Sequence, residues 1–188
     1  MADVQAVLLD AVRNCVRAAP LFTPTMPRTG QAFSVRMTNC GTLGWVSDSQ
    51  GYRYQPLHPV TGHPWPNIPS IALDLWRELA GVPVEPEACL INFYEPTAKM
   101  GLHQDKDETT FDAPVISISL GDDCLFRYGA ANRTGKTASV RLRSGDVLVM
   151  GGASRLCYHG VDRIYPGTST LLKQPGRINL TLRRVSTM

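Results

Sequence analysis

The sequence lacks the features that membrane and secreted proteins need. Its 188 residues contain no run of about 18 apolar residues that could span a bilayer. The N-terminus, MADVQAVLLDAVRNCVRAA, carries acids early and has no solid apolar stretch, so we expect no secretory signal there. The five cysteines are scattered without a C-x-x-C pair. This indicates reduced thiols in the cytoplasm rather than a disulfide framework or a zinc site.

A large excess of one charge sign is also missing, since the formal net charge is only +3. The charge is unevenly placed, because residues 101–188 carry 12 Lys and Arg against 8 Asp and Glu. A basic cluster there could contact phosphates, although a solvated sheet face explains it more simply. The cluster comprises Arg127, Arg133, Lys136, Arg141 and Arg143.

The apolar pattern predicts a single domain over residues 1–188 that is mostly β, of the α+β type. Helical spacing predicts helices over 3–18 and about 69–80, and the stretch between them, rich in Gly and Pro, predicts loops with short hairpins. From residue 88 onward the apolar residues alternate in short runs between turns, which indicates an antiparallel sandwich or jelly roll. We therefore expect helices and a lid-like region over 1–87 and a β core over 88–188.

Two of the four histidines suggest a metal site. In LHQDK, His103 and Asp105 are two positions apart and point to the same side of an extended segment. His159, in RLCYHGVD, could supply a third ligand from another strand. Two histidines and one carboxylate leave coordination positions open, as in non-haem Fe(II) oxygenases. H-x-D alone is weak evidence, and we expect His58 and His63 to be structural or at the surface.

Two further segments predict a polar pocket wall. Read as a strand, RINLTLR places Arg177, Asn179, Thr181 and Arg183 on one face, with the arginine Cα atoms about 20 Å apart. Guanidinium groups suit bidentate capture of a carboxylate, although two exposed surface arginines would fit the segment equally well. In LINFY, one face carries groups that could donate hydrogen bonds to an anion. They are Asn92 and Tyr94.

Taken together, these motifs resemble the bacterial AlkB family of DNA-repair dioxygenases. The likeness is carried by NFYEPTAKMGLHQDKDE, SISLG, GDVLVMGGASRLCYHGV and RINLTLR, in order, and it spans about residues 30–184. The segment MTNCGTLGWVSDSQGYRY resembles the nucleotide-recognition lid of that family. The resemblance implies a double-stranded β-helix (jelly roll) core with N-terminal helices and this lid.

The resemblance also implies an activity. The enzyme would use Fe(II), O2 and 2-oxoglutarate to remove N-alkyl groups from 1-methyladenine and 3-methylcytosine, releasing formaldehyde, succinate and CO2. Its partner would be alkylated single- or double-stranded DNA, possibly RNA, with no membrane involved. From the scattered cysteines we expect a cytoplasmic protein, and we expect a monomer because nothing in the sequence suggests an obligate partner.

The resemblance assigns roles to residues by matching position. The expected iron ligands are His103, Asp105 and His159. The expected 2-oxoglutarate contacts are Asn92, Tyr94, Arg177, Asn179 and Arg183. The expected substrate contacts are Trp45 in the base pocket, Tyr52 and Tyr54 near the nucleotide backbone, Asp107 near the exocyclic group of the base, and Arg133.

The match departs from a better-known member at Met150 and Cys157, where that member has Trp and Phe. Both positions are close in sequence to His159, so pocket volume and self-oxidation could differ. Two other functions stay open at this point. One is an Fe(II)/2-oxoglutarate oxygenase acting on RNA, protein or a small metabolite. The other is a non-catalytic jelly roll that binds a metal or nucleic acid.

Overall fold

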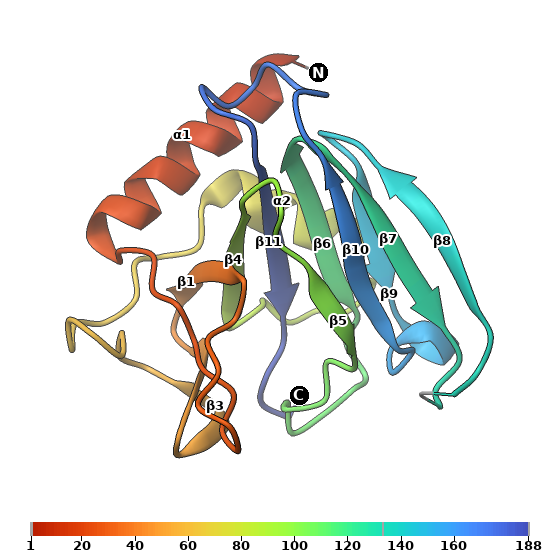
Figure 1. Ribbon diagram of the computed structural model, residues 1–188. Helices are drawn as coiled ribbons and strands as arrows, with labels where there is room; N and C mark the ends of the chain where they lie inside the picture. Colours follow the sequence, from red (N-terminus) through yellow and green to blue (C-terminus); the bar gives the residue numbers. More distant parts are fainter. Residues whose placement is uncertain (1, 133, 188) are drawn as a thin grey trace.

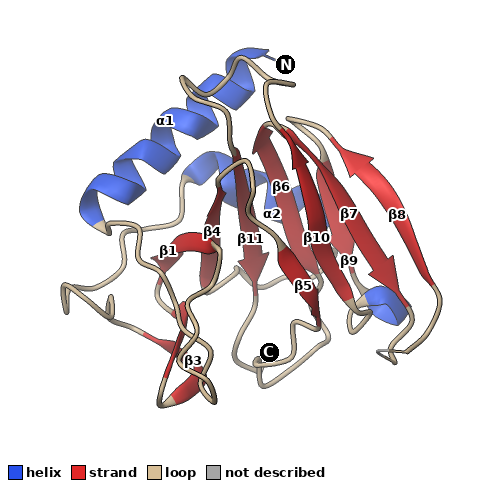
Figure 2. Cartoon of the chain, viewed as in Figure 1, coloured by secondary structure: helices blue, strands red, loops and turns tan. Residues whose placement is uncertain are grey.

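Two antiparallel sheets pack face to face in the computed structural model, which describes residues 2–132 and 134–187 (Figures 1 and 2). One sheet has the strand order β1-β4-β11-β6-β9, the other has the order β5-β10-β7-β8, and β2 and β3 form a separate hairpin. This arrangement confirms the expected jelly roll. The strands are β1 (Val35–Gly41), β2 (Gly44–Asp48), β3 (Gly51–Gln55), β4 (Ala88–Tyr94), β5 (Met100–His103), β6 (Val115–Gly121), β7 (Asp123–Gly129), β8 (Thr137–Leu142), β9 (Val147–Met150), β10 (His159–Tyr165) and β11 (Arg177–Arg183).

Two helices, α1 (Ala2–Ala18) and α2 (Ser70–Leu79), confirm the helical spacing of the sequence. They pack on the outer face of the five-stranded sheet, where α1 buries Leu8 and Val12 and α2 buries Trp76. Helical spacing of the apolar residues over 3–18 would also place Val4 and Val7 on the buried face, and this is wrong, because both are more than half exposed. No helix in the described parts of the chain is long and apolar enough to cross a membrane.

Strand β1 lies in a region where the sequence indicated only loops and short hairpins. It pairs with β4 over seven residues, from Val35 opposite Tyr94 to Gly41 opposite Ala88. Side chains on both of its faces are buried, so the alternation of polar and apolar residues that reveals a half-exposed strand is missing. The loop after β1 carries the β2–β3 hairpin, so this pairing ties the hairpin to the five-stranded sheet.

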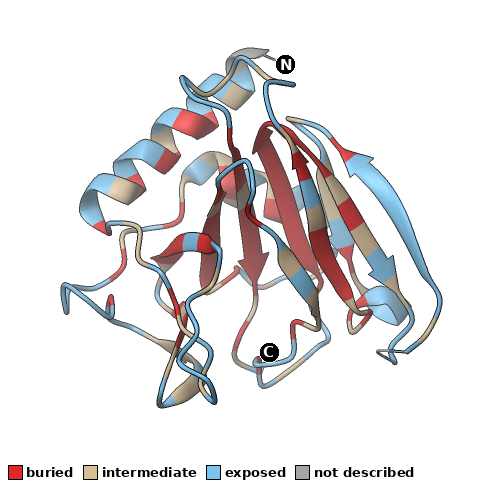
Figure 3. Ribbon diagram, in the orientation of Figure 1, coloured by how far each residue is buried: buried red, intermediate tan, exposed pale blue. Residues whose placement is uncertain are grey.

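The two sheets are covered to different extents (Figure 3). All seven residues of β6 are buried, whereas five of the six residues of β8 are exposed. A second apolar cluster fills the space between the sheets and includes Val115, Phe126 and Val161. The polar site described next lies between the same two sheets.

Candidate active site

Three side chains that can ligate a metal meet between β5 and β10. His103 ends β5 and His159 begins β10, and the two residues pair across these antiparallel strands. The carboxylate of Asp105 lies 3.8 Å from His103 Nε2 and 3.7 Å from His159 Nε2. The structure thus brings together the three residues that the sequence suggested, with one potential ligand atom from each within 4.8 Å of the others.

Backbone carbonyls orient both imidazole rings. His103 Nδ1 lies 2.8 Å from the carbonyl oxygen of Gly101, and His159 Nδ1 lies 3.1 Å from that of Cys157. A carbonyl oxygen only accepts hydrogen bonds, so the ring proton is on Nδ1 and the lone pair of Nε2 is available to a metal. Burial lowers the pKa of His159, which favours the neutral ring that metal binding requires.

The Asp105 carboxylate has one oxygen engaged and one open. Its Oδ1 forms an ion pair with Arg183 Nη2 at 2.8 Å, while Oδ2 is buried and accepts no hydrogen bond from any described residue. Burial alone would raise the pKa of Asp105, but Arg183, and then His159 and His103, outweigh it and lower the pKa to about 2. A buried anionic oxygen with no donor, beside two free imidazole nitrogens, fits a divalent cation such as Fe(II).

A polar stripe on the five-stranded sheet faces this triad. The register places Tyr94 opposite Arg177 and Asn92 opposite Asn179. Arg177 is buried and donates from Nη2 to the Ser119 hydroxyl at 2.7 Å. Within the described chain, Arg177 Nε and Asn92 Oδ1 are buried without a hydrogen-bond partner. Unpaired buried polar atoms are costly, so this stripe fits a small anion with further polar groups, as 2-oxoglutarate is.

One cavity of about 640 Å³ joins the triad, the stripe and the lid hairpin. Its walls include His103, Asp105 and His159 on one side and Asn92 and Arg177 on another. A cavity of this size holds a drug-sized ligand. The predicted metal and co-substrate residues therefore share one cavity. The alternative of two exposed surface arginines on β11 is excluded, because Arg177 and Arg183 are both buried.

The hairpin contributes an aromatic wall to the cavity. Trp45 on β2 stacks on Tyr52 of β3 with ring centroids 5.7 Å apart, and both line the cavity. Trp45 Nε1 donates to Asp107 Oδ2 at 2.7 Å, which ties the hairpin to the segment that follows the metal ligands. These three predicted substrate residues lie together at the cavity mouth.

The other two predicted substrate residues are Tyr54 and Arg133. Tyr54 is not among the residues that line the cavity, and its hydroxyl donates to Glu108 Oε1 at 2.7 Å and accepts from Arg183 Nη1 at 3.1 Å. The structure thus gives Tyr54 a place behind the metal site, and its expected contact with a nucleotide backbone stays a prediction. Arg133 lies outside the described residues.

The sequence pattern did not reveal two buried charged residues near the triad. Glu108 and Arg155 are 6 % and 3 % exposed. Arg155 donates from Nη1 to the carbonyl oxygen of Asp105 at 2.7 Å, and its Nη2 lies 3.4 Å from Glu108 Oε2. The only signal in the sequence was that Glu108 lies in the motif of His103 and Asp105, and Arg155 in the motif of His159. Such a signal does not distinguish a buried ion pair from two surface charges.

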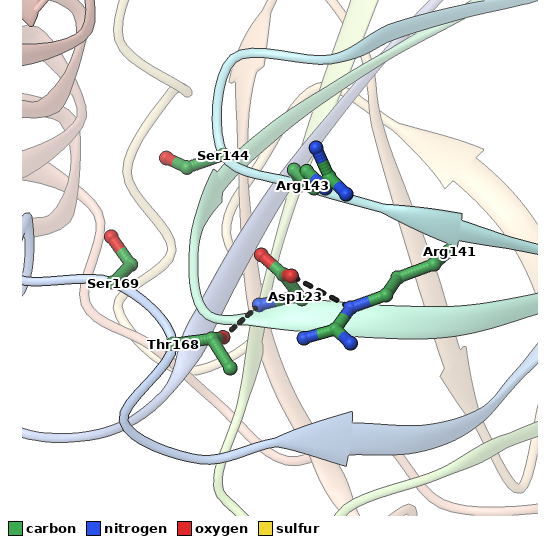
Figure 4. Close-up of a pocket in the computed structure, with 6 residues that line it drawn as sticks. All are labelled: Asp123, Arg141, Arg143, Ser144, Thr168 and Ser169. Carbon is green, nitrogen blue, oxygen red and sulfur yellow. Dashed lines mark hydrogen bonds and ion pairs between the residues drawn. The ribbon is translucent and has the colours of Figure 1, made fainter.

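A second hollow lies near the opposite end of the four-stranded sheet (Figure 4). There Arg141 donates to Asp123 Oδ2 at 2.8 Å, and the Thr168 hydroxyl accepts from the Asp123 backbone N–H. In the predicted basic cluster, Arg141 is therefore paired with Asp123, and Arg127 is paired with Asp162. These pairings favour the interpretation of a solvated sheet face, and this hollow lacks the histidines of the metal triad.

Comparisons with known proteins agree with this geometry. Residues 4–183 match the family described as the 2OG-Fe(II) oxygenase superfamily. The chain is 51% identical to the alpha-ketoglutarate-dependent dioxygenase AlkB homolog of Caulobacter vibrioides over 98% of this chain and 84% of that protein. It is 43% identical to alpha-ketoglutarate-dependent dioxygenase AlkB of Escherichia coli over 91% and 81%. A solved structure described as "The structure of OsALKBH1" superposes with a TM-score of 0.76 and 36% identity, covering 96% of this chain and 91% of that one.

Proposed function

Because the chain belongs to the 2OG-Fe(II) oxygenase superfamily and, within it, to the AlkB family, we propose that it repairs DNA by removing N-alkyl groups from nucleobases. It is a dioxygenase dependent on Fe(II) and 2-oxoglutarate. The proposed substrates are 1-methyladenine and 3-methylcytosine, and the proposed products of turnover are formaldehyde, succinate and CO2. The observation that carries the proposal is that the triad of His103, Asp105 and His159 opens into the cavity that Trp45 lines.

In this proposal, the Nε2 atoms of both histidines and Asp105 Oδ2 would hold the iron. Bound iron supplies the activation of O2, which, with 2-oxoglutarate as co-substrate, oxidises the alkyl C–H bond. The residues themselves bind and orient. The carbonyl oxygens of Gly101 and Cys157 keep the imidazole lone pairs aimed inward, and Arg183 keeps the Asp105 carboxylate ionised.

We assign opposite ends of 2-oxoglutarate to the two arginines of β11. Arg183 contacts Asp105, so it would lie beside the end of a bound 2-oxoglutarate that is nearer the metal ligands. Arg177 lies at the far end of the strand, with Tyr94 opposite in the register, and suits the distal carboxylate. Burial raises the pKa of Tyr94, so its hydroxyl stays protonated and can donate to that carboxylate.

The hairpin supplies the contact with the base. A base methylated at these ring nitrogens is cationic, so the face of Trp45 offers both stacking and cation–π attraction. Asp107, held by Trp45 Nε1, places a negative charge at the cavity mouth. The lesion must leave the stack to reach the triad that lines the cavity, which requires a flipped or single-stranded nucleotide.

The test uses single-stranded DNA with one 1-methyladenine, incubated with the protein, Fe(II), ascorbate and 2-oxoglutarate. We expect the oligonucleotide to lose the mass of one CH2 group, measured by mass spectrometry, and the His159→Ala variant to abolish this loss. His63→Ala is the matched control, because His63 is exposed and lies outside the cavity lining. If succinate forms but the oligonucleotide keeps its mass, the substrate is instead RNA, protein or a small metabolite. The expected cytoplasmic location and monomeric state stay predictions.

A further inference from the structure

Four charged side chains form a buried cluster behind the metal triad. Asp105 and Glu108 are the two carboxylates, and Arg155 and Arg183 are the two guanidinium groups. Their side chains are between 1% and 8% exposed. Asp105 pairs with Arg183 at 2.8 Å, and Glu108 lies 3.4 Å from Arg155 and 3.6 Å from Arg183. Two positive and two negative charges thus balance inside the protein, as buried charges require.

Arg155 fixes the irregular chain segment that carries Asp105. Residues 104–114 contain no helix or strand, so no regular hydrogen-bond ladder holds them. Arg155 Nη1 donates to the carbonyl oxygen of Asp105 at 2.7 Å, and its Nε donates to that of Ala113 at 3.0 Å. Its guanidinium carbon also lies 5.3 Å from the ring centre of Phe111. One buried side chain therefore bridges the two ends of the segment.

Glu108 supplies the second of the two negative charges that balance the two arginines of the cluster. Its Oε1 accepts from the Tyr54 hydroxyl, and its Oε2 accepts no hydrogen bond from any described residue, with Arg155 as its nearest cation at 3.4 Å. Without Glu108, the single charge of Asp105 would have to balance both Arg155 and Arg183. That imbalance would draw the Asp105 carboxylate toward Arg183 and leave an extra positive charge beside the metal position.

We propose that Glu108 is a positioning residue that sets the metal affinity of the site by neutralising Arg155 and Arg183, which leaves Asp105 Oδ2 free for the metal. The proposal rests on the ligand set of the proposed function. Because the proposal depends on charge balance, removal of the Glu108 charge should change the affinities for a cation and for an anion differently. Loss of the Glu108 charge weakens binding of a divalent cation, while binding of the 2-oxoglutarate dianion to the metal-loaded protein is maintained or strengthened.

The test measures binding of Co(II) alone, followed by its visible absorption, and then binding of 2-oxoglutarate to the Co(II)-saturated protein. Glu108→Gln keeps the size of the side chain and its acceptor for Tyr54. We expect its dissociation constant for Co(II) to rise about tenfold, the lower end of the usual effect of changes around a metal ligand, because Glu108 acts on Asp105 through Arg183. Its dissociation constant for 2-oxoglutarate should be equal to or lower than that of the wild type.

Two further variants separate charge from structure. Glu108→Asp keeps the charge and should bind Co(II) within about threefold of the wild type. Glu87→Gln makes the same chemical change outside the site, at a carboxylate that contacts Arg184 and accepts from Ser186, and should leave Co(II) binding unchanged.

The outcomes distinguish this inference from the ligand set. If Glu108→Gln weakens Co(II) and 2-oxoglutarate binding alike, or if Glu108→Asp is as weak as Glu108→Gln, charge balance is refuted and Glu108 is only structural. Unchanged Co(II) affinity in Glu108→Gln also overturns the inference, while leaving the ligand set intact. Failure of wild-type protein to bind Co(II), or full binding by His103→Ala, overturns the ligand set and this inference with it.

Discussion

The two sheets of the jelly roll contribute different parts of the site, and they are covered differently. The five-stranded sheet lies under α1 and α2 and supplies Arg177, which is 1% exposed. The four-stranded sheet has an exposed outer strand and supplies His103, whose side chain is 40% exposed. The contrast follows the chemistry. A carboxylate of the co-substrate is held best where water is excluded, whereas the metal must be within reach of a large substrate.

The largest expected difference between the sheets is in stability. Leu180 on β11 is fully buried, so Leu180→Ala should lower the free energy of unfolding by about 2–5 kcal/mol. Val140 on β8 is 39% exposed, and Val140→Ala should change it by no more than about 0.5 kcal/mol. Chemical denaturation of both variants measures the difference. Equal losses would show that β8 is covered in solution by something other than this chain.

The next effect concerns the co-substrate. Arg177→Met removes a buried charge that we assign to the distal carboxylate of 2-oxoglutarate. We expect the KM for 2-oxoglutarate to rise on the order of 100-fold, because a buried charge partner is lost. Co(II) binding should change little, since Arg177 does not contact the triad. Steady-state succinate assays with varied 2-oxoglutarate give the KM, and an unchanged value would remove Arg177 from the binding site.

The smallest effect is expected from an arginine of the exposed strand. Arg141 on β8 pairs with Asp123, but its side chain is 48% exposed, so the pair contributes only about 0–1 kcal/mol. Arg141→Gln should therefore leave both the unfolding free energy and the KM for 2-oxoglutarate nearly unchanged. A large loss of affinity for single-stranded DNA in this variant would instead assign phosphate contacts to the hollow of Figure 4.

The parts of the site that the sequence predicted are those encoded in local spacing. His103 and Asp105 lie two residues apart on an extended segment, and the β11 residues alternate along one strand, so their shared faces follow from strand geometry. His159 joined them because the chain has only four histidines. The two helices followed from apolar periodicity in the same way.

The parts that the sequence did not predict depend on contacts between distant segments. Arg155 contacts Asp105 and Glu108, which lie about 50 residues earlier in the chain. No periodic pattern in the sequence indicates such a pairing. Strand β1 is buried on both faces, which removes the alternation that identifies a strand. Tyr54 matched a position expected near the nucleotide backbone, but its hydrogen-bond partners Glu108 and Arg183 come from other parts of the fold.

The burial of all five cysteines has a consequence for an enzyme that we propose repairs nucleobases damaged by alkylating agents. Each thiol is at most 9% exposed, and burial raises the pKa of Cys124 and Cys157. The thiolate is the form that electrophiles attack, so these two sulfurs are shielded both by lack of access and by protonation. Cys124 and Cys157 of the folded protein are thus protected from the same class of reagent that generates its proposed substrates.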